Sequence, residues 1–158
     1  MDLRGGGGSG NKSSFNFSSC FSSGFSALLA LTSNEGSADF QWLRDENNIP
    51  LYEQVMRKAM EWGGVDQLMF VVGATRTDYL KHVRQIAPDH FFLVPGVGAQ
   101  GGSLADVAKY AMNSKVGLLV NSSRGIIYAG DDTSVSAARE AKKIKDEMTQ
   151  YLDQFWIK

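Results

Sequence analysis

Two glycine-rich stretches contain the residue types that could do chemistry in this chain. The first is Leu93–Ser103, LVPGVGAQGGS, and the second is Val120–Ala129, VNSSRGIIYA. Glycine has no side chain to keep a ligand away and tolerates a positive φ, so such loops let backbone N–H groups approach an anion closely. Gln100 can donate from its amide, and Arg124 can donate two parallel N–H bonds to phosphate oxygens. The two stretches together therefore predict a phosphate cradle.

The glycine spacing does not match the common nucleotide motifs. A P-loop needs a GK[ST] sequence, which this chain lacks. A dinucleotide fingerprint needs a long helix opening at its last glycine and an acidic residue after the next strand, and neither follows here. Glycine spacing of this kind is also common in ordinary turns, so the first loop alone is weak evidence for a binding site. The SSRG sequence one strand later strengthens the prediction. The predicted loop backbone consists of Gly96, Gly98, Gly101, Gly102 and Gly125.

The elements that must position these loops alternate between short apolar runs and amphipathic segments. The apolar runs predict strands at Ala27–Thr32, Leu68–Val72, Phe91–Val94 and Val116–Val120. Helices are predicted from Pro50 to Gly63, over Thr77–Ile86, after a Ser103 cap, and from about Ser134 to Phe155. This βαβαβαβα order predicts parallel strands with the helices outside.

The number of βα units leaves two architectures open. Four units are half of an eightfold barrel, and a whole barrel runs to about 250 residues. Of the 158 residues, positions 1–26 form a Gly/Ser-rich tail, expected to be disordered or non-native, and 27–158 form the folded unit. The chain is thus either an open α/β sheet or part of a barrel. In barrels, a phosphate site often lies in the loops after the last two strands.

Composition narrows the class of protein further. A formal charge of −1 gives no basic field for nucleic acid, and no apolar run approaches the ~20 residues of a membrane helix. The run Phe25–Leu31 is explained as well by a strand as by a signal peptide. Cys20 is the only cysteine and cannot form an internal disulfide, so we expect a cytoplasmic protein. Neither His82 nor His90 has metal-ligand spacing, and no metal is expected.

Several motifs resemble one enzyme family. LVPGVGAQGGS followed by GLLVNSSRGIIYA resembles the C-terminal half of orotidine 5′-phosphate decarboxylase. ALTSNEGS, PLYEQV and MFVVGAT resemble the preceding units of its bacterial second-type branch, so that the resemblance covers roughly Leu28–Leu152. It implies the C-terminal half of a (β/α)₈ TIM barrel. It also implies conversion of orotidine monophosphate to uridine monophosphate and CO₂ without a cofactor, usually by a homodimer.

The resemblance also implies roles for individual residues. Gln100 and Arg124 would bind the substrate phosphate together with the backbone of Gly125. Pro95 would lie against the pyrimidine, and Ser33 would hydrogen-bond the base. Tight binding of a distant phosphate can organise such a site around the reacting ring.

One departure from the family pattern affects the expected activity. The family reaction depends on a Lys/Asp cluster, roughly D-x-K-x-x-D, which this sequence lacks. Asp78/Lys81 and Asp106/Lys109 are expected to be helix-surface pairs. We therefore expect a fragment without catalytic residues, which binds phosphate weakly and does not decarboxylate. The alternatives are a non-catalytic phosphate-binding module that assembles with a complementing half-barrel or its own copy, and a phosphate-binding barrel enzyme of different chemistry.

Overall fold

The strands form one parallel sheet in chain order. The computed structural model describes residues 24–74, 77–98 and 101–155. Its strands lie in the order β1-β2-β3-β4, and their bounds are β1 (Ser26–Leu31), β2 (Leu68–Val72), β3 (Phe91–Pro95) and β4 (Leu118–Asn121). Each strand pairs in parallel with the one before it. A doubly wound sheet would reverse its order part-way, whereas a barrel does not.

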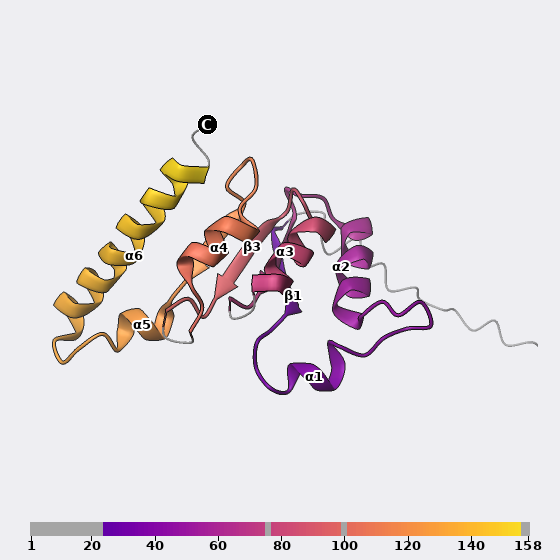
Figure 1. The fold of residues 1–158 in the computed structure, drawn as a ribbon, viewed down its shortest axis with the longest axis horizontal. Coiled ribbons are helices and arrows are strands. Elements are labelled where there is room, and N and C mark those ends of the chain that lie inside the picture. The colour runs from indigo at the N-terminus through magenta and orange to yellow at the C-terminus, as the bar shows by residue number, and fades with distance from the viewer. Residues whose placement is uncertain (1–23, 75–76, 99–100, 156–158) are drawn as a thin grey trace, which may run out of the picture.

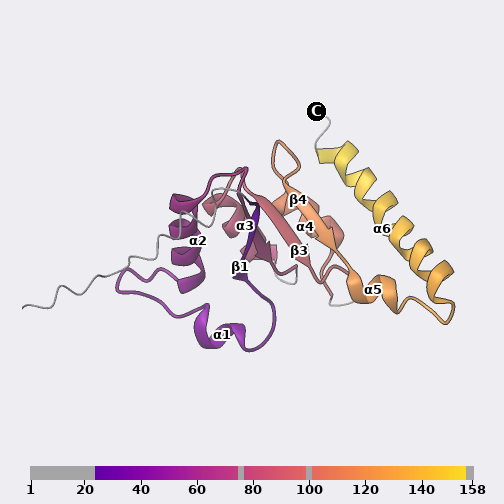
Figure 2. The ribbon, with the colours of Figure 1, turned by 180° about the vertical axis from the view of Figure 1, so that it is seen from behind.

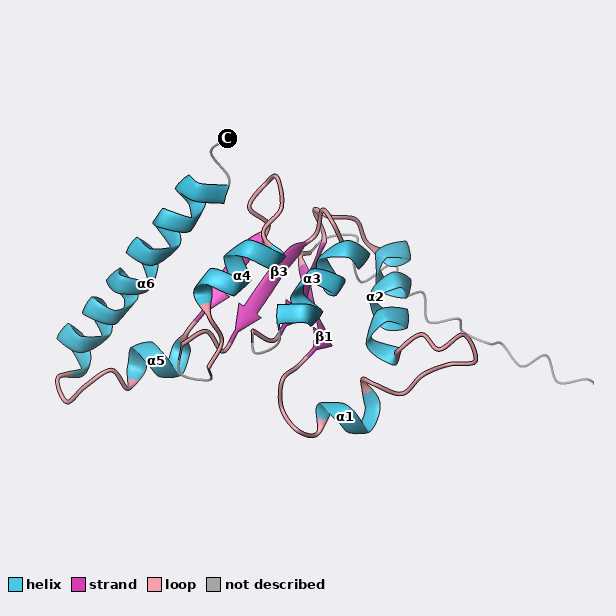
Figure 3. Cartoon of the chain, viewed as in Figure 1, coloured by secondary structure: helices cyan, strands magenta, loops and turns pink. Residues whose placement is uncertain are grey.

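Helices follow each strand, as Figure 3 shows. Their bounds are α1 (Ser37–Phe40), α2 (Leu51–Trp62), α3 (Thr77–Ile86), α4 (Leu104–Ala111), α5 (Ser123–Ile127) and α6 (Thr133–Phe155). The predicted fold class, four βα units corresponding to half of a (β/α)₈ barrel, is confirmed. The predicted disordered tail lies outside the described residues except for its last three positions, and the 26/27 domain boundary stays a prediction.

The hydrophobic core lies between the sheet and the helices α3 and α4. Phe70, Phe92 and Val94 alternate along β2 and β3 and are fully buried. Figure 1 looks onto the face of the sheet that α3 and α4 cover, and Figure 2 shows β3 and β4 from behind, where no described helix lies in front of them. On that second face Leu29 and Leu119 remain 56% and 52% exposed. Among the described residues, helices therefore cover one side of the sheet only.

Arg84 joins the elements at the amino-terminal end of the strands. Its guanidinium lies 3.7 Å from the centroid of the Phe92 ring. It also donates to five backbone carbonyls, those of Ala87, Pro88, His90, Ala111 and Gly117. Since these carbonyls follow α3, end α4 and precede β3 and β4, one side chain fixes how four elements meet.

The structure corrects some sequence-based expectations. β4 begins at Leu118 rather than Val116, because Val116 and Gly117 have φ values of 68° and 62° and form a turn. The short helices α1 and α5 are not among the helices that the sequence predicted. His82 is exposed, and its Nε2 lies 3.0 Å from a carboxylate oxygen of Glu53 on α2.

Candidate functional site

The loops after β3 and β4 start from neighbouring positions. Pro95 and Asn121 are register partners at the ends of the two strands. The backbone N–H of Gly96 donates to the carbonyl of Asn121 at 3.2 Å, which extends the pairing by one residue. The two glycine-containing loops therefore leave the carboxyl edge of the sheet side by side.

The loop after β3 closes on itself through backbone hydrogen bonds. Gly101 N–H donates to the Gly98 carbonyl at 2.9 Å, and Gly98 N–H donates to the Gly102 carbonyl at 2.9 Å. Gly98 and Gly101 have φ values of 80° and 83°, which favour glycine. A Cβ on Gly102 would lie 2.5 Å from the Cβ of Ala74 and 3.0 Å from the Gly96 carbonyl oxygen. The glycines therefore allow this turn to pack tightly against the end of β2.

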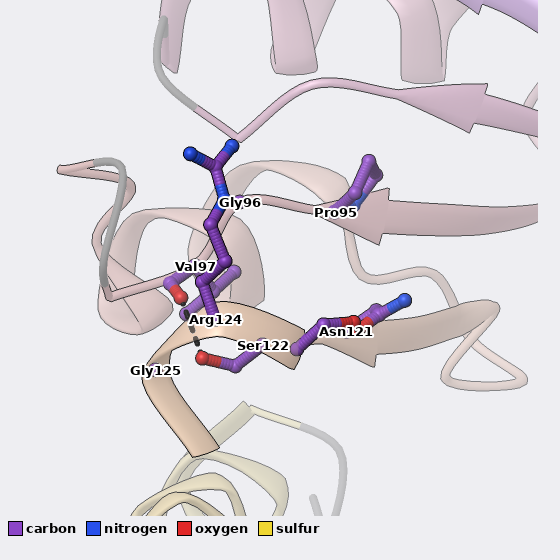
Figure 4. A pocket seen from close by; sticks show the side chains of 8 residues that line it. Pro95, Gly96, Val97, Asn121, Ser122, Arg124 and Gly125 are labelled. Carbon is purple, nitrogen blue, oxygen red and sulfur yellow. Dashed lines mark hydrogen bonds between the residues drawn. The ribbon is translucent and has the colours of Figure 1, made fainter. Parts of the chain in front are cut away.

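A buried hydroxyl joins the two loops. The Oγ of Ser122 donates to the carbonyl of Val97 at 2.8 Å, as Figure 4 shows. Ser122 occupies the N-cap position of α5, yet its side chain makes no capping bond there. The first intrahelical bond runs from Ile126 N–H to the Ser122 carbonyl. The N–H groups of residues 123–125 precede that bond and have no partner within the helix.

The two loops line a polar cavity of about 190 Å³. Its walls are Pro95, Gly96, Val97, Asn121, Ser122, Ser123, Arg124 and Gly125. Arg124 is exposed and extends beside Gly96 in Figure 4. None of the ion pairs found among the described residues involves Arg124. A cavity with a cation at its mouth, and with amides in its wall that have no partner within the helix, can hold a small anion.

A second cavity, of about 350 Å³, adjoins the first and shares Val97, Ser122 and Gly125 with it. Gly98 and Gly102 line it together with residues of α6. Among these, Lys143 lies 3.5 Å from a Glu140 carboxylate oxygen. The Lys143 charge is thus shared with a carboxylate, so Arg124 is the better candidate for anion binding.

Ser33 belongs to a different part of the carboxyl edge. It lines a cavity of about 200 Å³ with Trp42, Gly73 and Tyr79. Gly73 lies so close that a Cβ on it would be 2.9 Å from the Ser33 Oγ. Ser33 thus follows β1 and touches the end of β2, at the same edge of the sheet as the loops after β3 and β4.

The predicted site residues are therefore divided among neighbouring regions. Pro95, Gly96, Arg124 and Gly125 share one cavity, Gly98 and Gly102 line the adjoining one, and Ser33 lines the third. Gly101 takes part in the loop turn, and Gln100 lies outside the described residues. Sequence reasoning did not single out Asn121 and Ser122. The available signal for these two residues was the presence of amide and hydroxyl side chains directly before the Arg-Gly pair.

Within the described ranges, no group of three or more His, Cys, Asp or Glu side chains could hold a metal ion. No helix in the same part of the chain is long and apolar enough to span a bilayer.

A parallel sheet in chain order, covered by helices on one side and hollowed between the ends of its last two strands, defines a protein of the (β/α)-barrel class. Residues 22–141 match the sequence profile of the Orotidine 5′-phosphate decarboxylase / HUMPS family. The chain belongs to this family, and the predicted family membership is confirmed.

Curated and solved relatives agree with this assignment. An orotidine 5′-phosphate decarboxylase of Flavobacterium johnsoniae is 53% identical over 128 residues, which are 80% of this chain and 46% of that protein. The structure of Leishmania donovani UMP synthase matches with a TM-score of 0.62 and 39% identity, over 74% of this chain and 26% of that one. The structure of Leishmania donovani OMP decarboxylase matches with a TM-score of 0.60 and 35% identity, over 75% and 45%. The chain spans about half the length of the curated relatives it matches.

Proposed function

We propose that this chain carries the phosphate-binding part of an orotidine 5′-phosphate decarboxylase. In this proposal, the cavity between the β3 and β4 loops holds the 5′-phosphate of orotidine or uridine monophosphate. The supporting observation is the position of Arg124 at a polar cavity of about 190 Å³, outside any ion pair of the described residues. An unpaired guanidinium can give both of its parallel N–H groups to a phosphate.

Each proposed contact has a physical reason. Arg124 supplies charge, and the N–H groups of residues 123–125 supply dipoles in the same wall. Gln100 adds an amide donor from the opposite loop. Pro95 presents an apolar ring towards the pyrimidine, and Ser33 hydrogen-bonds the base from the end of β1. Phosphate contacts remote from the ring would position it for the reaction.

The decarboxylation step itself needs groups that this sequence does not contain. No D-x-K pattern occurs in it. Asp78/Lys81 lie on α3 and Asp106/Lys109 on α4, and neither pair has the third member of the family cluster at the cluster's spacing. We therefore propose that the chain by itself binds nucleotide and leaves the substrate carboxylate intact. The cytoplasm stays the proposed compartment, because a single cysteine suits a reducing environment.

The binding proposal can be tested by titrating the purified chain with uridine monophosphate, using calorimetry and the ³¹P chemical shift. Arg124→Ala should weaken binding about tenfold or more, because each hydrogen bond to a charged group contributes about 1.5–3 kcal/mol. Arg124→Lys should recover part of the loss. Arg139→Ala removes an exposed arginine of α6 and is the matched control. Equal affinities of Arg124→Ala and the unmodified chain would contradict the proposed phosphate site.

The catalytic part of the proposal needs a separate assay. Orotidine monophosphate is incubated with the chain, and uridine monophosphate is measured by chromatography. We expect no product above the uncatalysed level. Turnover at a rate near that of full-length enzymes would show that other residues supply the reacting groups.

A further inference from the structure

Asn121 lies at the end of β4, on the face of the sheet that no described helix covers. Asn121 and Pro95 are register partners at the ends of their strands. Side chains alternate between the two faces of a strand, and the buried Val94 and Leu118 point towards the helices. Pro95 and Asn121 therefore point to the opposite face, from neighbouring strands about 5 Å apart.

The side-chain amide of Asn121 is held in one orientation by a neighbouring hydroxyl. The Oγ of Ser123 donates to Asn121 Oδ1 at 2.7 Å. This bond leaves Nδ2 as the free end of the amide, and Nδ2 has no hydrogen-bond partner among the described residues. In Figure 4 the nitrogen of Asn121 is directed away from Arg124 and Ser122. Because an amide nitrogen can donate two hydrogen bonds, an unused donor is fixed at the end of β4.

This donor occupies a different part of the cavity from the proposed phosphate contact. Asn121 and Arg124 both line the cavity of about 190 Å³. The Arg124 side chain extends beside Gly96, whereas the Asn121 amide lies on the Pro95 side of the same cavity (Figure 4). A ligand whose phosphate lies at Arg124 would thus bring the group attached to that phosphate to Asn121.

We propose that Asn121 is a specificity-determining residue that recognises the nucleoside part of the ligand. Its Nδ2 donates to an oxygen acceptor there, a sugar hydroxyl or a pyrimidine carbonyl. Ser123 is the positioning residue that keeps the amide turned towards this acceptor. A donor fixed before the ligand arrives loses little conformational freedom on binding. The inference rests on the proposed function, because it takes the phosphate to lie at Arg124.

The test compares uridine monophosphate with inorganic phosphate on the same purified variants. Asn121→Ala should weaken uridine monophosphate binding about threefold to tenfold, the effect of one neutral hydrogen bond. Its affinity for inorganic phosphate should change less than about twofold, so the ratio of the two affinities falls. Asn47→Ala removes an exposed asparagine outside the three cavities and should leave the ratio unchanged. Far-UV circular dichroism establishes that each variant is folded.

Variants of Ser123 test the positioning role. Ser123→Ala should lower the same ratio although the amide is still present, and Ser123→Thr, which keeps a hydroxyl, should restore it. The double variant Asn121→Ala/Ser123→Ala should lose no more than Asn121→Ala alone, because both changes remove one interaction. An unchanged ratio in Ser123→Ala would overturn this role.

Ribose 5-phosphate as a third ligand identifies the acceptor. If Asn121→Ala weakens its binding as much as that of uridine monophosphate, the bond goes to the sugar, and if its binding is unaffected, the bond goes to the base. An unchanged ratio in Asn121→Ala would overturn the inference even where Arg124→Ala still weakens phosphate binding. Equal phosphate affinities of Arg124→Ala and the unmodified chain would instead overturn the proposed phosphate site, and this inference with it.

Discussion

The hydroxyl of Ser122 donates a buried hydrogen bond of 2.8 Å to the carbonyl of Val97, joining loops that are 25 residues apart in the sequence. This bond sets the distance between the glycine loop after β3 and the first turn of α5. The proposed anion cavity lies between the same two segments. The shape of the cavity therefore depends on a side chain that need not contact the ligand.

Ser122→Ala should lower both stability and nucleotide affinity. Removing the hydroxyl leaves the Val97 carbonyl buried without its partner, which costs about 1–3 kcal/mol of unfolding free energy. Urea unfolding and uridine monophosphate titration measure the two effects. Ser134→Ala is the control, because Ser134 is exposed, lines neither of the two adjoining cavities, and donates its hydroxyl to Asp132 Oδ1. Equal behaviour of the two variants would show that the loop connection is unimportant.

Gly102→Ala should destabilise the chain by about 1–3 kcal/mol through overpacking. The new methyl group would meet the Ala74 Cβ at 2.5 Å and the Gly96 carbonyl oxygen at 3.0 Å, neither of which belongs to a flexible side chain. Thermal and urea unfolding measure the effect. Gly64→Ala is the matched control, since a Cβ there meets no atom within 4 Å, and we expect a change within about 0.5 kcal/mol.

Arg84→Lys should be strongly destabilising although it keeps the charge. An ammonium group cannot reach the five carbonyls that the guanidinium bonds, so several carbonyls would lose their donors at about 1–3 kcal/mol each. Burial lowers the pKa of Arg84 to about 10, which still leaves it protonated at neutral pH. Arg57→Lys changes a half-exposed pair with Glu53 and should cost far less. Similar urea midpoints for the two variants would contradict this role of Arg84.

His90 should make the chain less stable in mild acid. Its ring is buried beside Phe70, and neither ring nitrogen has a hydrogen-bond partner among the described residues. Burial lowers the pKa of His90 below its ordinary 6.5, against the opposing effect of the Asp89 carboxylate. The unfolded chain therefore binds the proton more readily, so stability is complete above about pH 6.5 and decreases as the pH falls below it.

His90→Phe should remove this pH dependence while preserving the packing. The measurement is the urea midpoint between pH 7.5 and 5.5, where the variant should show a flatter profile than the unmodified chain. His82→Gln is the control, because the His82 side chain is 46% exposed and its Nε2 lies 3.0 Å from the Glu53 carboxylate. A His90→Phe profile as steep as that of the unmodified chain would show that another group controls acid stability.

The regular elements were largely predictable because their signals are local. The apolar run at Leu68–Val72 and the helix at Thr77–Ile86 have the bounds that the sequence indicated. Ser103 accepts the predicted cap bond, from the N–H of Asp106. The predicted start of β4 at Val116 was wrong. Val116 is β-branched and would ordinarily avoid the left-handed region, yet it adopts that conformation here. Two backbone bonds with Asn113, one in each direction, hold it there in a tight local turn.

The sequence by itself determined the alternation of strands and helices, the family resemblance and the position of the glycine loops after the third and fourth strands. These properties follow from residue periodicity and from the steric freedom of glycine, which act within a few positions. Only the tertiary structure decided that Ser122 bonds Val97, that Arg84 donates hydrogen bonds to five carbonyls, and that Ser33 lines a cavity apart from Arg124. Those contacts depend on how strands far apart in the sequence align in the sheet, and no local pattern encodes that register.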